Sequence, residues 1–205
     1  MDVGETINAR MAAAYDEVAA EFAEKNAVMP APYLAVLPGF LTQAGTGTTI
    51  LDLGCGAGRD LACLSAQGAS VVGADLSAGM LAQAKQHGVG QLLRVDMRRL
   101  PFADDSFGGV WCSASLLHLP KQDAPGALAE MHRVLAPGGP LMLAIQQGDG
   151  EAWETWPYGT VERFFARYQP DEIAGLLAEA GFTVAERHAE LTPTRHWLRL
   201  LATRA

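Results

Sequence analysis

Three glycines lie within five residues in the segment Gly54-Cys-Gly-Ala-Gly58, which has the clearest capacity to hold a ligand. Glycines allow a tight turn and close approach of a ligand to the backbone, and a helix that begins after such a loop offers amide donors to an anion. Asp52 comes just before the loop, where its carboxylate would repel a pyrophosphate and attract an ammonium group. The alternative for Asp52 is a structural role as acceptor for the glycine amides, and one carboxylate has enough lone pairs for both roles.

A second acid, Asp75, lies 21 positions after Gly54. This spacing is typical of a carboxylate that binds both hydroxyls of a ribose, a role that NAD enzymes share. The structural alternative is a charge at the start of a helix that Ser77 caps. Asp52 is the residue that favours S-adenosylmethionine over NAD or ATP, because this cofactor carries an ammonium, a carboxylate and a sulfonium but no phosphate.

A third acid, Asp96, is followed by Met97. Asp96 would accept a hydrogen bond from an adenine amino group, and the Met97 amide would donate one to a ring nitrogen. Leu76 and Met80 would enclose the base from its two faces, although a methionine taken alone is more often a core residue.

His118, in the segment SLLHLP, is the best candidate for a general base. Methyl transfer is a displacement at a sulfonium carbon with a good leaving group, so positioning supplies much of the catalysis. Phenol or amine acceptors need a base, and a histidine near the cofactor would serve. The alternative is a loop histidine that only shapes the pocket.

Short apolar runs and helical patterns alternate between these residues. Such alternation predicts an α/β fold, in which a parallel sheet carries helices on both faces and the carboxyl ends of its strands meet at one edge. We expect strands at 50–53, 70–75, 91–95, 109–113 and 141–145, and helices at 60–67, 77–87 and 124–135.

The two ends of the chain have different patterns. At the N-terminus an amphipathic helix is expected over 5–25, followed by a proline-rich break and a polar turn. After residue 147 the pattern weakens, and a helix over 171–180 then precedes strands at 182–190 and 197–203, which the short turn makes antiparallel. We expect residues 1–47 to be an N-terminal helical lid or extension, and residues 48–205 to form one compact domain.

The composition narrows the class of partner. The chain has 205 residues and a formal net charge of −8, and it has no cluster of Lys and Arg of the kind that binds nucleic acid or an anionic membrane surface. Its first ten residues include acids and no apolar stretch, so we expect no signal peptide, and no apolar run is long enough to span a membrane. The acidic balance therefore favours a small-molecule partner. The three cysteines have no metal-binding spacing, so we expect no metal, and their odd number favours a cytoplasmic protein over a disulfide-bonded one.

With these residues in order, the chain resembles the class I S-adenosylmethionine-dependent methyltransferase family, and within it the type 11 group. The matching motifs are LDLGCGAG, VVGADLS, RVDMRRLPFADDSFGGVWCS and LAPGG, over roughly residues 48–145. The resemblance implies a Rossmann-like seven-stranded sheet with an antiparallel last strand, and an N-terminal helix that closes the site with Tyr15 facing the cofactor. It also implies a set of residues that line the cofactor site: Asp52, Gly54, Cys55, Gly56, Asp75, Leu76, Asp96, Met97 and Ser113. For Ser113 the alternative is a hydroxyl that bonds the backbone at a strand end, and for Tyr15 it is a core-facing aromatic ring.

The methyl acceptor is the open question. Aromatic residues between 153 and 165 are candidates for its pocket: Trp153, Trp156, Tyr158, Phe164 and Phe165. Arg59, Arg163 and Arg167 are candidates for binding an anionic acceptor, although we expect solvated surface positions for all three. Two other functions compete with methyl transfer. An NAD-linked oxidoreductase would have GxGxxG and a second dinucleotide-binding half, which this chain lacks, whereas a non-catalytic S-adenosylmethionine-binding or regulatory module fits the same sequence.

Overall fold

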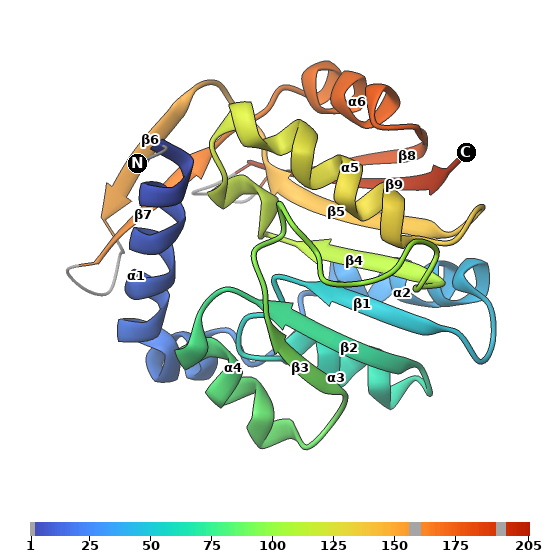
Figure 1. Cartoon of the computed structure of the whole chain (residues 1–205), viewed down its shortest axis with the longest axis horizontal. Helices are drawn as coiled ribbons and strands as arrows, with labels where there is room; N and C mark the ends of the chain where they lie inside the picture. Colours follow the sequence, from blue (N-terminus) through green and yellow to red (C-terminus); the bar gives the residue numbers. More distant parts are fainter. Residues whose placement is uncertain (1–2, 156–160, 192–195) are drawn as a thin grey trace.

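A seven-stranded sheet forms the centre of the computed structural model, which describes residues 3–155, 161–191 and 196–205 (Figure 1). The strand order is β3-β2-β1-β4-β5-β9-β8. The pairs from β3 to β5 are parallel, and β9 is antiparallel to both of its neighbours. The strands are β1 (Thr49–Leu53), β2 (Ser70–Asp75), β3 (Gln91–Arg94), β4 (Gly109–Ser113), β5 (Pro140–Gln146), β8 (Phe182–Leu191) and β9 (His196–Arg204). The predicted mostly parallel sheet with an antiparallel last strand is confirmed.

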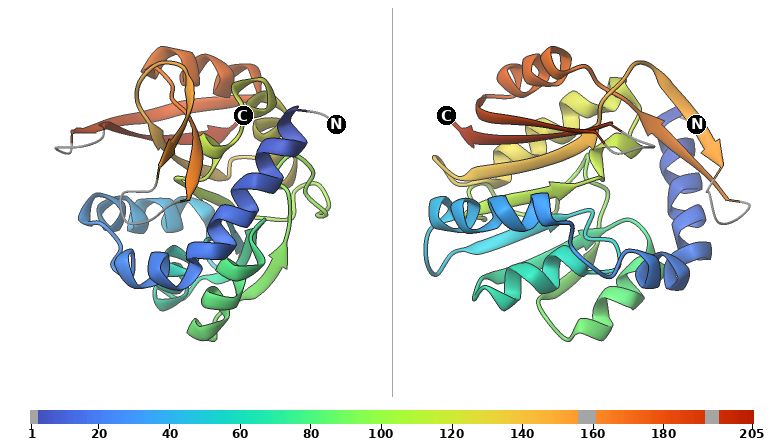
Figure 2. Two further views of the ribbon diagram at one scale, coloured as in Figure 1. Left: turned by 90° about the vertical axis from the view of Figure 1, so that its left-hand side faces the viewer. Right: turned by 180° about the vertical axis from the view of Figure 1, so that it is seen from behind.

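Helices cover both faces of this sheet, as Figures 1 and 2 show from opposite sides. The helices are α1 (Val3–Lys25), α2 (Ala31–Ala44), α3 (Arg59–Ala66), α4 (Ala78–Ala84), α5 (Ala124–Val134) and α6 (Pro170–Glu179). Because side chains alternate along a strand, Leu51 faces the core under α5 and α6, while Ile50 faces the core under α2 and α3. Within the described ranges, none of the helices combines the length and the apolar character that a membrane span requires.

Helix α2 is absent from the sequence prediction, which treated the prolines around it as a break. Pro30 is its N-cap residue and a second proline lies in its first turn, where a missing amide hydrogen costs nothing. Phe40 packs edge-to-face against Trp111 of β4, with ring centroids 5.1 Å apart. Burial of this apolar face explains why the helix forms even though it contains Pro38.

A second element that the sequence did not predict is the antiparallel hairpin of β6 (Glu151–Thr155) and β7 (Glu162–Ala166). It lies outside the main sheet and beside α1 (Figures 1 and 2). Helix α1 itself stands across the carboxyl ends of the parallel strands, which is the edge where ligands bind in open α/β sheets.

Asp16, in the second half of α1, joins this helix to the start of α4. Its Oδ1 accepts hydrogen bonds from the Ser77 hydroxyl at 2.5 Å and from the Gly79 amide at 2.7 Å. Ser77 is also the N-cap of α4, as predicted, because its Oγ accepts from the Met80 amide at 3.0 Å. A polar contact with α4 is thus one of the contacts that hold α1 over the sheet edge.

Candidate functional site

A cavity of about 970 Å³ lies at the carboxyl edge of the sheet, beneath α1. This volume is at the upper end of the range typical of sites for small ligands. All the site residues predicted from the sequence line it: Asp52, Gly54, Cys55, Gly56, Asp75, Leu76, Met80, Asp96, Met97, Ser113 and His118. The fold brings them together because Asp52, Asp75, Asp96 and Ser113 each lie at or just after the carboxyl end of a parallel strand.

Asp52 is the most unusual group in the cavity. It is 1% exposed, and its Oδ2 has no hydrogen-bond partner among the described residues. Burial and the nearby Asp60 raise the pKa of Asp52 well above its ordinary value. Asp60, by contrast, accepts from Arg59 at 2.5 Å and from the Trp111 indole at 2.9 Å. A buried carboxylate oxygen without a donor is costly, so it marks a place where a ligand can supply one.

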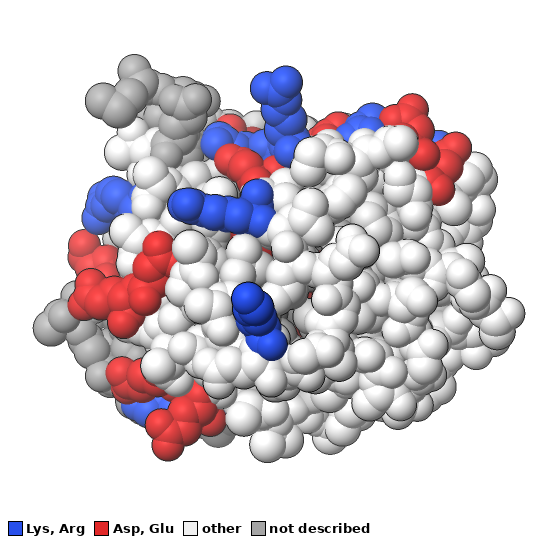
Figure 3. All heavy atoms as spheres, turned by 60° about the horizontal axis from the view of Figure 1, so that its bottom comes forward, with Lys and Arg blue, Asp and Glu red and all other residues white. Residues whose placement is uncertain are grey.

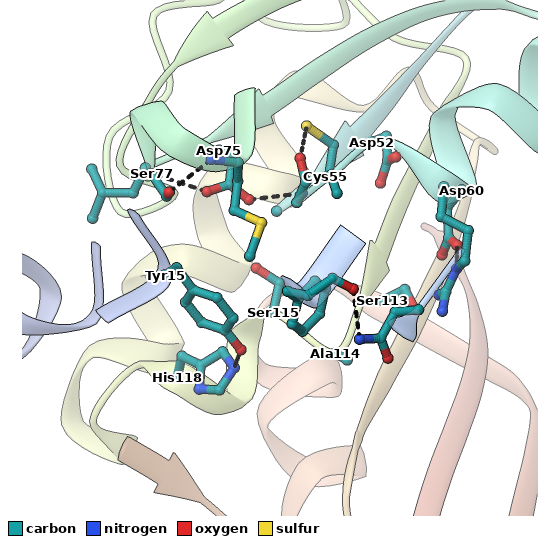
Figure 4. A pocket seen from close by; sticks show the side chains of 18 of the residues that line it. Tyr15, Asp52, Cys55, Asp60, Asp75, Ser77, Ser113, Ala114, Ser115 and His118 are labelled. Atoms are coloured by element: carbon teal, nitrogen blue, oxygen red, sulfur yellow. Dashed lines mark hydrogen bonds and ion pairs between the residues drawn. The ribbon is translucent and has the colours of Figure 1, made fainter. Parts of the chain in front are cut away.

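The glycine loop does not depend on Asp52 for its hydrogen bonds. The Gly54 and Cys55 amides both donate to the Ala74 carbonyl, and the Gly56 amide donates to Asp75 Oδ2 at 2.8 Å. The structural role that the sequence left open for Asp52 is therefore performed by its neighbours on β2, and Asp52 lines the cavity (Figure 4) with its Oδ2 lacking a donor among the described residues.

Asp75 has the structural role that was considered for it as an alternative. Its Oδ1 accepts from the Ser77 amide at 2.8 Å, at the start of α4. Burial raises its pKa, although the Ser77 and Gly56 amides oppose that shift. A carboxylate has about four acceptor sites, so two amide bonds leave capacity for ribose hydroxyls.

Asp96 is held by a basic side chain. Arg98 donates to both of its oxygens, and Asn8 of α1 donates to Oδ2 at 3.2 Å. Burial alone would raise the pKa of Asp96, but the hydrogen bonds from Arg98 outweigh it and the pKa is lowered. Met80 is 1% exposed and packs with Ala19 and Ala57, so it is a core residue that also borders the cavity.

The backbone between β4 and His118 takes an uncommon conformation. Ala114 has φ of 53°, in the left-handed region that residues with a Cβ avoid. The chain then enters a 3₁₀ turn over Leu116–His118. Ser113, Ser115 and His118 all line the cavity as a result (Figure 4). The Ser113 hydroxyl is buried and has no partner among the described residues, which excludes the backbone hydrogen bond considered for it.

His118 is fixed at both ring nitrogens. Its Nδ1 lies 2.7 Å from the Phe164 carbonyl oxygen, and its Nε2 lies 2.8 Å from the Tyr15 hydroxyl. A carbonyl oxygen only accepts, so Nδ1 carries a hydrogen; in the neutral ring Nε2 is then an acceptor for the Tyr15 hydroxyl. Tyr15 also borders the cavity, so it is more than the core-facing ring that the sequence favoured.

The three arginines have three different environments. Arg59 borders the cavity and is paired with Asp60. Arg167 forms an ion pair with Glu154 and is not a cavity residue. Arg163 is 5% exposed and lines the cavity, so the expectation of a solvated position is wrong for this residue, because its guanidinium packs against the rings of Tyr15 and Phe165.

The aromatic residues expected around the acceptor are only partly in the cavity. Phe165 lines it, whereas Trp153 and Phe164 pack against each other with centroids 5.6 Å apart, outside the cavity. Trp156 and Tyr158 lie outside the described residues. The cavity also includes residues that no sequence motif indicated: Asn8, Tyr33, Glu190 and Trp197. They come from segments distant in the chain, so only the fold identifies them.

On the face shown in Figure 3, most charged side chains lie toward the left and the top, and a wide area at the lower right carries none.

Comparison with known proteins identifies the family of this chain. The family described as "Methyltransferase domain", type 11, matches residues 51–143. Methyltransferase GfsG of Streptomyces halstedii is 39% identical over 110 residues, covering 50% of this chain and 39% of GfsG. Methyltransferase sll0829 of Synechocystis is 31% identical over 170 residues, covering 78% of this chain and 74% of that protein. The match to GfsG thus spans well under half the length of that relative.

The fold has close counterparts among solved structures. The Burkholderia thailandensis 1,6-didemethyltoxoflavin-N1-methyltransferase, with bound 1,6-didemethyltoxoflavin and S-adenosylhomocysteine, superposes with a TM-score of 0.79 at 20% identity, covering 100% of this chain and 92% of that one. The family match, the alignment with the Synechocystis methyltransferase over most of its length and the shared fold all indicate the same family. This chain belongs to the class I S-adenosylmethionine-dependent methyltransferase family, within its type 11 group.

Proposed function

We propose that this protein transfers a methyl group from S-adenosylmethionine to a small-molecule acceptor. The observation that carries the proposal is the buried carboxyl group of Asp52, which lines the cavity and whose Oδ2 has no donor among the described residues. An ammonium group would supply that donor and would offset the cost of the buried charge.

The residues around the cavity fit the other parts of this cofactor. Asp52 would hold the ammonium, with the Ser113 hydroxyl as a second polar contact. Asp75 would bind the ribose hydroxyls with its remaining lone pairs. The loop at Gly54, Cys55 and Gly56 would lie against the cofactor. Asp96 and the Met97 amide would contact the adenine, between Leu76 and Met80.

The chemistry requires little of the protein beyond binding and orientation. When bound, the cofactor supplies a methyl carbon on a sulfonium: the acceptor's lone pair forms the new bond, and the electrons of the broken carbon–sulfur bond stay on sulfur. We propose that His118 is the base for an acceptor that binds with its proton. Because the Tyr15 hydroxyl occupies Nε2, the proton would pass to Tyr15 as Tyr15 gives its own to His118.

Helix α1 would act as the lid of the site, within the N-terminal segment 1–47. Asn8 and Tyr15 both extend from it into the cavity. A covered cavity of about 970 Å³ favours a small acceptor over a polymer, and the Burkholderia enzyme of the same fold binds such a small molecule. A cytoplasmic location remains a prediction, and the three unbridged cysteines are consistent with it.

Calorimetry with S-adenosylmethionine, S-adenosylhomocysteine and NAD tests the first part of the proposal. We expect binding of the two sulfur ligands and none of NAD. If neither sulfur ligand binds, the proposal is wrong. A methyl-release screen over phenols, amines, thiols and carboxylic acids tests the second part, and binding without turnover across that screen would favour the non-catalytic module.

A further inference from the structure

Strand β7 presents alternate side chains to the cavity. Arg163 and Phe165 line it, while Phe164 between them packs against Trp153 outside. The Phe164 backbone fixes this arrangement, because its carbonyl accepts from His118 and its amide donates to the Met11 sulfur of α1 at 3.0 Å. The register of β7 therefore determines which of its side chains meets a ligand.

Arg163 is the β7 residue whose position is unusual. It is 5% exposed, and its guanidinium carbon lies 5.0 Å from the Phe165 ring centroid and 5.9 Å from that of Tyr15. Its Nη1 donates to the Tyr15 hydroxyl oxygen at 3.4 Å. A guanidinium stays charged at any physiological pH. A permanent positive charge therefore lies beside the two residues to which we assign the acceptor's proton.

Arg167, four residues further along, provides the contrast. Its guanidinium carbon lies 5.9 Å from the same Phe165 ring, but it does not line the cavity. The two arginines share a strand, a ring contact and a residue type. Of the two, Arg163 lines the cavity and Arg167 does not.

Charged residues lie in different parts of the cavity wall. Asp52 and Asp60 lie together in one part of it, and the Tyr15–His118 pair lies in another (Figure 4). The first part suits a cationic cofactor, whereas Arg163 makes the part beside Tyr15 favourable for negative charge. A guanidinium is also the side chain best suited to a planar oxyanion, because it donates two parallel hydrogen bonds.

We propose that Arg163 binds a negatively charged oxygen group of the methyl acceptor, so that the acceptor class is an organic acid, either a carboxylate or an ionised phenol or enol. The proposal rests on the proposed methyltransferase function and names its substrate class. An anionic group held by Arg163 lies close to Tyr15 and His118, which places the rest of the acceptor at the catalytic end of the cavity.

Paired probes test this assignment by calorimetry on protein saturated with S-adenosylhomocysteine. Benzoate, phenylacetate and 4-hydroxybenzoate are each compared with the corresponding primary amide, and 4-nitrophenolate is compared with 4-nitroanisole. We expect at least one acid to bind tenfold or more tightly than its neutral partner. Preference among the carboxylates alone, or for the phenolate alone, identifies which oxyanion is bound.

The variants locate the preference. Arg163→Met is expected to weaken acid binding about 10- to 100-fold and to leave the neutral partners within twofold. Arg163→Lys keeps the charge and should retain part of the preference, while the matched control Arg167→Met should retain all of it. Arg163→Gln replaces Arg163→Met if thermal unfolding shows that the methionine variant does not fold.

The proposal is overturned if no acid binds better than its neutral partner, or if the preference survives in the folded Arg163 variants that lack the charge. Failure of the proposed function is a separate result, because it is seen earlier as absent binding of S-adenosylhomocysteine. In that case the same acid and amide pairs are measured on the unliganded protein, where the preference for acids still decides the role of Arg163.

Discussion

The Tyr15 hydroxyl oxygen lies 2.8 Å from His118 Nε2, although the two residues are 103 positions apart in the chain. Tyr15 belongs to α1 and His118 to the turn after β4. Their rings also meet edge-to-face with centroids 5.3 Å apart. The contact joins helix α1 to the residue that we propose as the base, so we expect the position of α1 to determine whether the Tyr15–His118 pair forms.

Removing the Tyr15 hydroxyl is expected to slow turnover without releasing the cofactor. For Tyr15→Phe we expect kcat/KM to fall about 10²- to 10⁴-fold with the acceptor found in the methyl-release screen, because the proton path to His118 is broken. S-adenosylhomocysteine affinity should change by less than threefold. Single-turnover kinetics and calorimetry measure the two effects, and His118→Ala should show the same pattern.

The control for this pair is His132→Asn. His132 lies on α5, packs edge-to-face with Phe182 and does not line the cavity, so this variant should keep normal turnover. If His118→Ala or Tyr15→Phe retains near wild-type turnover while the cofactor binds, the base role is wrong.

Asp52→Asn is expected to weaken the cofactor and to strengthen the unliganded fold. The pKa of Asp52 is raised well above its ordinary value, so the folded state opposes its ionisation and this costs folding free energy at neutral pH, where Asp52 of the unfolded chain is ionised. The cost is absent at low pH and grows as the pH rises through the folded-state pKa. We expect a melting temperature higher by roughly 2–4 °C for each kcal/mol regained, and at least tenfold weaker binding of S-adenosylmethionine.

Ligand binding should also release protons from Asp52, because an ammonium stabilises its charged form. Affinity should therefore increase as the pH rises, and calorimetry in buffers of different ionisation enthalpy should detect the release in wild type but not in Asp52→Asn. Asp60→Asn is the matched control: it loses charge-assisted hydrogen bonds to Arg59 and is expected to lower the melting temperature. A lower melting temperature for Asp52→Asn as well would contradict this account.

Two glycines of the loop should respond differently to alanine. A Cβ on Gly54 would lie 1.8 Å from the Ser115 Oγ, at φ of 75°, so Gly54→Ala should cost about 2–4 kcal/mol of stability. A Cβ on Gly56 meets no atom within 4 Å, and φ of 52° costs about 1 kcal/mol. Gly56→Ala should therefore fold. Because we propose that this loop lies against the cofactor, the variant should bind the cofactor about tenfold more weakly. Chemical denaturation measures the stability of each variant, and calorimetry measures its cofactor binding. Equal losses of stability in Gly54→Ala and Gly56→Ala would contradict the steric difference between the two positions.

Asp16→Ala should loosen α1 from α4. It removes the acceptor for the Ser77 hydroxyl and the Gly79 amide, which is worth about 0.5–2 kcal/mol at a helix start. Hydrogen exchange over α1 should become faster, and the cofactor should dissociate faster. Glu17→Ala, an exposed neighbour, is the control and should change neither rate. Unchanged exchange in Asp16→Ala would show that other contacts hold the helix.

The sequence by itself determined the sheet and the acids at its edge. Each parallel strand is a local apolar run, and Asp52, Asp75 and Asp96 end or follow such runs. Since parallel strands end at one edge, position along the chain was enough to group them in space. The N-cap role of Ser77 and the hairpin of β8 and β9 were predictable for the same reason, because they depend on neighbours within a few residues.

Only the tertiary structure decided how the Tyr15–His118 end of the cavity is built. Helix α2 forms against Trp111 despite its prolines. Strand β7 has no alternating signal because residues on both of its faces are buried: Arg163 and Phe165 line the cavity, and Phe164 packs against Trp153. Arginine is a residue type typical of the surface, and only the position of β7 beside the cavity buries Arg163. The pairing of Tyr15 with His118 joins segments that are far apart in the chain, and such contacts depend on the packing of the whole fold rather than on any local preference.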